Sequence, residues 1–158
     1  MKSIYLMVLL AFLMIASPAQ AAQNTPASPP VNAKCPVCGM FVARYPGWVA
    51  SISFKDSTLV YFDGPKDLFK FYLDPGKYIP ARRQGDITGT HVKDYYSLGV
   101  IDARHAFFVI GSNVLGPMGK ELAPFARKDD AEGFMRDHHG EKILRFGDIN
   151  LSVLKKLE

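Results

Sequence analysis

Residues 48–65 read Trp-Val-Ala-Ser-Ile-Ser-Phe, Lys-Asp-Ser, Thr-Leu-Val-Tyr-Phe and Asp-Gly-Pro. The two runs at 48–54 and 58–62 are rich in β-branched and aromatic residues, and a short polar segment separates them. This is the pattern of a β-hairpin. Asp63-Gly64-Pro65 then supplies a turn with proline near the first position of a helix. The apolar residues that follow share one helical face: Leu68, Phe69, Tyr72 and Leu73.

The second half of the chain partly repeats this order. After a looser stretch at 80–89, residues 106–110 (Ala-Phe-Phe-Val-Ile) predict another strand. A phenylalanine, an aspartate and a second phenylalanine recur with the same spacing 63 residues later: Phe62, Asp67 and Phe71 against Phe125, Asp130 and Phe134. The echo suggests two related units.

The C-terminal third predicts two further helices and one strand. We expect Asp129 or Asp130 to cap a helix that carries an apolar face and ends with Gly140 in the C′ position. Residues 142–146 predict a strand, and a last helix should open at Asp148. The sum is an α+β fold in which two related ββαβ units, about 35–90 and 91–158, pack together.

The first 21 residues have the features of a signal peptide. Lys2 gives a positive start, 4–16 is an apolar run, and Ala19-Gln20-Ala21 is an A-x-A cleavage site. The run is shorter than the roughly 20 residues that a spanning helix needs, so we expect cleavage and not retention as an anchor. Residues 22–34 are rich in proline, alanine, serine, threonine and asparagine and predict a flexible leader. The sequence thus predicts a periplasmic protein with no membrane tether.

Composition and missing motifs exclude several classes of function. The formal net charge is +4, and removal of Lys2 with the signal peptide leaves +3, which predicts no nucleic-acid partner. The sequence has no glycine-rich phosphate loop, no HExxH and no GxSxG, so nucleotide binding and hydrolysis are not expected. Two cysteines are too few for a disulfide scaffold. The remaining 35–158 is long enough to form one domain with its own core.

The chemistry is concentrated in Cys35-Pro-Val-Cys38-Gly39-Met40, which places two thiols and a thioether within six residues. Soft sulfur ligands favour Cu(I), and a thioether argues against zinc. Residues two apart in an extended chain point to opposite faces, so Cys38 and Met40 can share an ion only if Gly39 turns the backbone.

Other uses of the cysteine pair stay open at this point. The CxxC pair could close as an inert disulfide in a protein that binds another envelope protein, or it could serve a thiol-disulfide oxidoreductase. The residues after Cys38 are typical of a turn and strand, whereas a reactive cysteine usually opens a helix. Structural zinc needs four ligands, and the sequence has no second CxxC or suitably spaced histidine pair.

A second candidate ligand lies in Gly116-Pro-Met118-Gly-Lys-Glu-Leu122, where the turn residues should expose Met118 on a loop. Packing of the loop is the competing explanation for this methionine. His91 and His105 are single histidines, expected at the surface or hydrogen-bonded in the core. His138 and His139 are expected near a helix C-terminus, where the helix dipole favours them.

Three ordered motifs resemble the nitrous-oxide-reductase accessory protein family, NosL: Cys35-Pro-Val-Cys-Gly-Met40, Tyr61-Phe-Asp-Gly64 and Gly116-Pro-Met-Gly-Lys-Glu-Leu122. The resemblance runs from about Cys35 to about Phe146. It implies a pair of ββαβ units and a periplasmic Cu(I) chaperone that is not an enzyme. It also implies a copper-receiving partner, nitrous oxide reductase or another cuproprotein, and work beside a membrane transporter complex.

The resemblance also implies a ligand set. Cys38 and Met40 would bind Cu(I), and Met118 from the second unit would complete a soft site between the units. Cys35 and His105 are further candidates. Many members of the family are lipoproteins, whereas this sequence has no cysteine at the end of its apolar run to carry a lipid.

Overall fold

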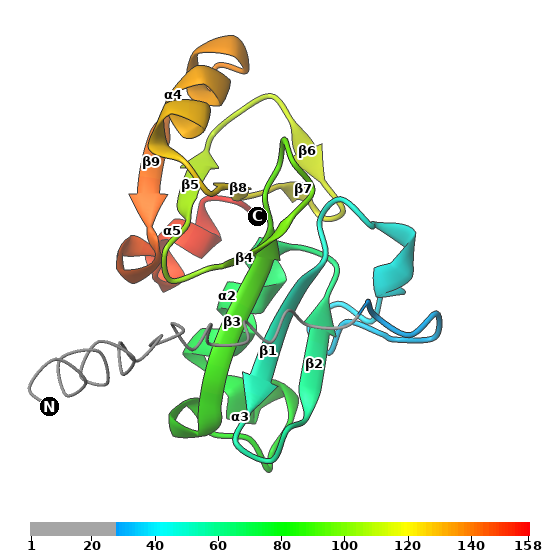
Figure 1. Ribbon diagram of the computed structural model, residues 1–158. Helices are drawn as coiled ribbons and strands as arrows, with labels where there is room; N and C mark the ends of the chain where they lie inside the picture. Colours follow the sequence, from blue (N-terminus) through cyan, green and yellow to red (C-terminus); the bar gives the residue numbers. More distant parts are fainter. Residues whose placement is uncertain (1–27) are drawn as a thin grey trace, which may run out of the picture.

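The computed structural model describes residues 28–158 (Figure 1). The expected signal peptide and residues 22–27 of the expected leader lie outside the described residues. The end of that leader is folded, because the Ala33 N–H donates to the Pro30 carbonyl and the Val42 N–H donates to the Ala33 carbonyl. Within residues 28–158, every helix is too short or too polar to cross a membrane.

The first unit is built as residues 48–65 predict. Strand β1 (Ala50–Phe54) lies between β2 (Leu59–Phe62) and β3 (Ile87–Lys93), antiparallel to both, and β4 (Val100–Asp102) extends the sheet beyond β3. Helix α2 (Pro65–Leu73) follows β2 and has Pro65 in its first position. A short helical segment, η1 (Val42–Arg44), precedes β1, and two more, α3 (Pro75–Tyr78) and η2 (Gln84–Asp86), lie between α2 and β3.

The second unit has the same topology. Strand β5 (Phe107–Ile110) lies between β8 (Ala123–Phe125) and β9 (Lys142–Arg145), and helix α4 (Lys128–Asp137) connects β8 to β9. The small hairpin β6 (Leu115–Gly116) and β7 (Gly119–Lys120) is inserted between β5 and β8. The segments η3 (Phe146–Asp148) and α5 (Leu151–Lys155) close the chain. The expected α+β fold of two related ββαβ units is confirmed.

The core joins the two units. The larger buried cluster holds Cys35 and Phe71 from the first unit together with Phe108 and Leu154 from the second. Helix α5 packs against α2, which ties the C-terminus to the first unit (Figure 1). A smaller cluster around Phe134 belongs mainly to the second sheet and α4. The division into units near residue 90 stays a prediction, and β3 runs across that position.

Two expectations about local structure were wrong. The stretch at 80–89 contains η2 and the start of β3. The sequence indicates this strand only weakly, because glycine and polar residues dominate Ile87–Lys93. Helix α5 opens at Asn150, whose side chain accepts the N–H groups of Ser152 and Val153. Asp148 instead ends η3, where its carboxylate accepts the Arg145 N–H.

The ends of α4 also differ from expectation. Arg127 is the N-cap residue, so Asp129 and Asp130 lie in the first turn. There their negative charges interact favourably with the positive end of the helix dipole. At the other end His139, not Gly140, adopts the left-handed conformation with φ 55°. The Gly140 N–H donates to the Met135 carbonyl, as in a Schellman motif. A Cβ on Gly140 would overlap Val109, which explains the glycine at this position.

Candidate metal centre

A tight loop before η1 presents the two cysteines. The Cys35 N–H donates to the Met40 carbonyl at 2.9 Å, and the Gly39 N–H donates to the Cys35 carbonyl at 2.8 Å. Gly39 has φ +78°, the left-handed conformation that glycine adopts without strain. The backbone therefore turns at Gly39, as the sequence predicted. Cys35 is buried and Cys38 is half-buried, and both are free thiols.

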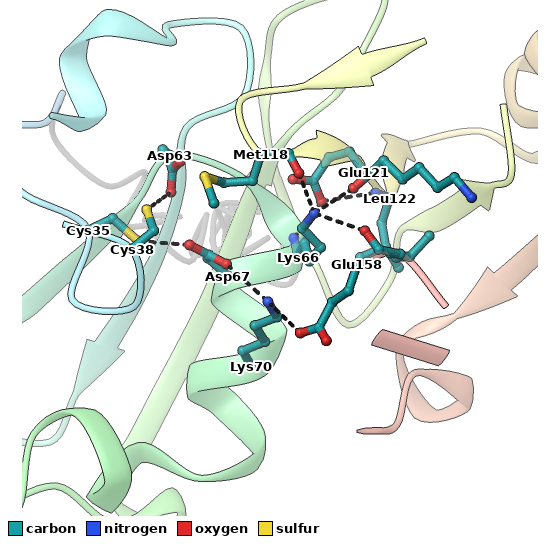
Figure 2. Close-up of polar contacts among 12 residues, drawn as sticks. Cys35, Cys38, Asp63, Lys66, Asp67, Lys70, Met118, Glu121, Leu122 and Glu158 are labelled. Atoms are coloured by element: carbon teal, nitrogen blue, oxygen red, sulfur yellow. Dashed lines mark hydrogen bonds and ion pairs between the residues drawn. The ribbon is translucent and has the colours of Figure 1, made fainter. Parts of the chain in front are cut away.

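Two aspartates at the start of α2 face these thiols (Figure 2). The Cys35 thiol donates to Asp67 Oδ2 at 3.3 Å, and the Cys38 thiol donates to Asp63 Oδ1 at 3.4 Å. One ligand atom from each of the four residues lies within 4.8 Å of all the others. We call Cys35, Cys38, Asp63 and Asp67 the thiol–carboxylate group. Its geometry can hold a metal ion.

The surroundings favour positive charge in this group. Asp63 and Asp67 are 1% and 2% exposed, and the buried Asp63 Oδ2 has no hydrogen-bond partner within residues 28–158. Lys70 Nζ lies 4.0 Å from Asp67 Oδ1, but it also pairs with Glu158 at 3.1 Å. Asp67 thus shares its cation with Glu158, and a metal ion between the two buried carboxyls would gain electrostatic stabilisation.

The thiols hold their protons firmly. Burial raises the pKa of Cys35 far above its usual range, and the Asp67 charge adds to this effect. Burial likewise raises the pKa of Cys38 to about 12. Burial also raises the pKa of Asp67. An incoming metal ion must therefore displace the thiol protons, and its binding must weaken in acid.

Met118 comes to this group from the second unit. It lies in the turn between β6 and β7 and is 45% exposed, as the sequence predicted. Figure 2 shows its thioether sulfur directed toward the side where Asp63, Asp67 and Cys38 gather. Met40 is half-buried in the cysteine loop. Both methionines stay predicted ligands.

The histidines lie apart from the thiol–carboxylate group. The His105 side chain is 84% exposed and pairs with Asp102 at 3.2 Å, so the structure does not bring it to the cysteines. His91 is half-buried in β3, and its Nδ1 has no hydrogen-bond partner among the described residues, unlike the expected hydrogen-bonded core histidine.

Sequence reasoning missed the two aspartates as possible ligands. Asp63 was assigned to a turn and Asp67 to the internal echo, because neither has a ligand-type spacing to the cysteines in the chain. The only signal was that Asp63 belongs to Tyr61-Phe-Asp-Gly64, one of the three motifs that carry the family resemblance. Its proximity to Cys38 depends on how the loop folds over α2.

The same geometry disfavours thiol-disulfide exchange. A reactive cysteine has a lowered pKa, whereas burial raises the pKa of both thiols here. Cys38 is followed by the turn at Gly39 and not by a helix. The fold and this site define a small α+β protein with a buried sulfur and carboxylate group suited to a metal ion.

Comparison with known proteins agrees with that class. The sequence profile of the NosL family matches residues 26–154. The copper-binding lipoprotein NosL of Stutzerimonas stutzeri is 30% identical over 125 residues, which cover 78% of this chain and 65% of that protein. The crystal structure of the copper chaperone NosL from Shewanella denitrificans superposes with a TM-score of 0.68 at 30% identity, covering 81% of this chain and 98% of that one.

The chain belongs to the NosL family. The resemblance carried by the three motifs is therefore confirmed, and the relatives are named as copper-binding or copper-chaperone proteins, not as enzymes. The chain aligns with slightly less than two thirds of the curated lipoprotein's length.

Proposed function

We propose that this protein is a Cu(I) chaperone that binds one ion at the thiol–carboxylate group. The observation that carries the proposal is the convergence of four ligand atoms within 4.8 Å at the junction of the cysteine loop and α2. Cys38 and Cys35 supply thiolates, and Met118 and Met40 supply thioethers. This mixture of soft donors suits Cu(I) better than the harder divalent ions.

The exposure of the ligands suits a protein that gives up its ion. Cys35 is almost fully buried, while Cys38 is half-buried and Met118 is 45% exposed. An incoming partner ligand can approach from the Met118 side and bind copper before the thiolates leave. Transfer by ligand exchange avoids releasing Cu(I) into water.

We further propose that the protein is exported by its signal peptide and delivers copper in the periplasm. The receiving protein is a copper enzyme, nitrous oxide reductase being the one that the family resemblance implies. A membrane transporter complex is a second proposed partner. The S. stutzeri relative is named a lipoprotein, whereas this chain lacks a cysteine at the end of its apolar run.

The test is an anaerobic titration of the reduced mature chain with Cu(I) against a chromophoric chelator. The wild-type protein, Cys38→Ser and Met118→Leu are compared, with Met135→Leu on α4 as the matched control for a methionine outside the site. We expect one copper per chain, loss of tight binding in Cys38→Ser, weaker binding in Met118→Leu and no change in Met135→Leu.

The proposal would be wrong if the wild-type chain failed to compete with the chelator, or if Cys38→Ser kept wild-type stoichiometry and affinity. An insulin-reduction assay on the same samples checks the rejected alternative. Turnover of insulin that depends on Cys35 and Cys38 would restore the thiol-disulfide oxidoreductase interpretation.

A further inference from the structure

Lys66 is a buried cation that connects the two units beside the metal centre. It is the second residue of α2 and is 2% exposed. Its Nζ donates to the carbonyl oxygens of Met118 and Lys120, each at 2.7 Å, and to that of Leu157 at 3.2 Å (Figure 2). An ammonium group has three N–H donors, and all three are used here. Two of them hold the β6–β7 hairpin.

Glu121 adds a second attachment between the same elements. Its Oε1 accepts the Lys66 backbone N–H at 2.6 Å and the Leu122 N–H at 2.9 Å. The residue is 5% exposed and follows β7 directly. The first turn of α2 is therefore bound to both the turn of the hairpin and its outgoing end.

Two glycines make room for this attachment. A Cβ on Gly64, the N-cap of α2, would overlap the Glu121 carboxylate. A Cβ on Gly116 would lie 2.8 Å from Glu121 Cγ, closer than such atoms approach. The hairpin can thus lie against α2 only because both positions lack side chains.

The start of α2 therefore contacts two parts of the candidate site, the cysteine loop and the hairpin that carries Met118. Asp63 and Asp67 contact the cysteine thiols, while Lys66 between them binds the Met118 carbonyl. We propose that Lys66 is a positioning residue that holds the Met118 thioether at the thiol–carboxylate group and so sets the preference for Cu(I) over Zn(II). This inference rests on the proposed function of that group.

The argument for selectivity follows from ligand chemistry. Zn(II) accepts both thiolate sulfurs and carboxylate oxygens as ligands, so the thiol–carboxylate group alone discriminates poorly between Cu(I) and Zn(II). A thioether binds Cu(I) well and contributes little to Zn(II). Loss of the Lys66 ammonium leaves the cysteines, the aspartates and the Glu121 attachment in place but removes the bonds to the Met118 and Lys120 carbonyls. It should therefore weaken Cu(I) binding and spare Zn(II) binding.

The experiment measures both metals in the reduced mature chain. Lys66→Met, Met118→Leu and the double variant are compared with wild type, and Lys128→Met is the control because Lys128 lies on the exposed side of α4 and pairs with Glu132. Cu(I) affinity comes from chelator competition and Zn(II) affinity from a zinc indicator. The methionine methyl groups are labelled with ¹³C and followed by NMR.

We expect Lys66→Met and Met118→Leu each to lower Cu(I) affinity on the order of 10–100-fold, with no further loss in the double variant because both act on one ligand. Zn(II) affinity should stay unchanged. Cu(I) should shift the Met118 methyl resonance in wild type and in Lys128→Met, but not in Lys66→Met.

Three results would overturn the inference while leaving the proposed function standing: wild-type Cu(I) affinity in Lys66→Met, additive losses in the double variant, or equal losses of Cu(I) and Zn(II). Failure of the wild-type chain to bind Cu(I) would overturn both.

A second variant keeps the test decisive if circular dichroism shows that Lys66→Met does not fold. Gly64→Ala retains Lys66 but places a methyl group where the Glu121 carboxylate lies, so this carboxylate and its hydrogen bond to the Lys66 N–H must shift. It should show the same selective loss of Cu(I) affinity, and unchanged Cu(I) affinity in a folded Gly64→Ala protein would contradict the inference.

Discussion

The two ββαβ units share a framework, yet within residues 28–158 only the first carries a thiol–carboxylate group. In the first unit the ring centroids of Phe62 and Phe71 lie 5.2 Å apart. The equivalent residues of the second unit are Phe125 and Phe134, and their ring centroids lie 5.0 Å apart. Asp67 and Asp130 are each the third residue of their helices. Asp67 is buried against Cys35, whereas the Asp130 side chain is 40% exposed beside Arg127.

The difference lies in what covers the helix N-terminus. In the first unit the cysteine loop covers the start of α2, removes Asp67 from water and gives its carboxylate a thiol partner. The described part of the second unit presents the start of α4 to solvent, with both acidic residues exposed or half-exposed. The fold thus provides two similar helix ends, and the added cysteine loop makes one of them a candidate metal site.

The largest effect should come from truncating the equivalent helix phenylalanines. Phe71→Ala and Phe134→Ala each remove a fully buried ring and should destabilise the protein by about 3–5 kcal/mol, measured by urea unfolding. Phe71 belongs to the cluster that includes Cys35, so its loss should also weaken Cu(I) binding. Phe134→Ala, assayed where it is folded, should bind Cu(I) as wild type does. Equal copper losses in both variants would break the comparison.

The equivalent aspartates should differ in their effect on the thiols. Asp67→Asn removes a charge that raises the pKa of Cys35, so this pKa should fall, although burial, the larger cause, keeps it above that of an ordinary cysteine. Asp130→Asn should leave both thiol pKa values unchanged. Thiolate absorbance at 240 nm, followed against pH, measures this. A pKa shift of similar size in the two variants would mean that the Asp67 charge acts on the thiols no more strongly than the distant Asp130 charge does.

Glu121 tests the contact between the units. Burial raises its pKa to about 8 from an ordinary 4.5. The folded state therefore holds this proton more tightly than the unfolded state, and the stabilisation is lost as pH rises from about 4.5 to about 8. Over that window the melting temperature of wild type should fall relative to that of Glu121→Gln. Parallel profiles would show that Glu121 ionises normally.

The smallest effect should appear at the C-terminus of α4. The left-handed residue that ends this helix has no counterpart at the end of α2. His139→Gly relieves a left-handed conformation and should stabilise the protein by up to about 1 kcal/mol. Gly140→Ala should destabilise it, because the added methyl group overlaps Val109. Urea midpoints of the two variants measure both effects, and destabilisation by His139→Gly would show that the imidazole makes a contact worth more than the strain.

Local patterns predicted the framework because its strands and helices are encoded in short segments. The hairpin at 48–62, Pro65 at the start of α2 and the echo between the units were all confirmed. Strand β3 was missed because its stability comes from pairing with β1 and β4, not from its own residues. The N-cap residues of α4 and α5 were predicted wrongly because several polar residues near the start of each helix could serve as the N-cap.

The site was predicted only in part for a related reason. Cys35, Cys38 and Met40 lie within six residues, so their proximity is visible in the sequence. Asp63 and Asp67 reach the thiols across separations of 25 and 32 residues, and Met118 comes from another unit. Such contacts depend on tertiary packing, which periodicity and spacing do not report.

The most direct test of a copper centre at the thiol–carboxylate group is a crystal structure of the Cu(I)-loaded chain with an anomalous difference map at the copper edge. The account predicts a single peak within bonding distance of Cys38 Sγ, beside Met118 and the two aspartates, and none at the start of α4. A principal peak at His91, His105 or the histidines after α4, with the thiols unligated, would contradict it.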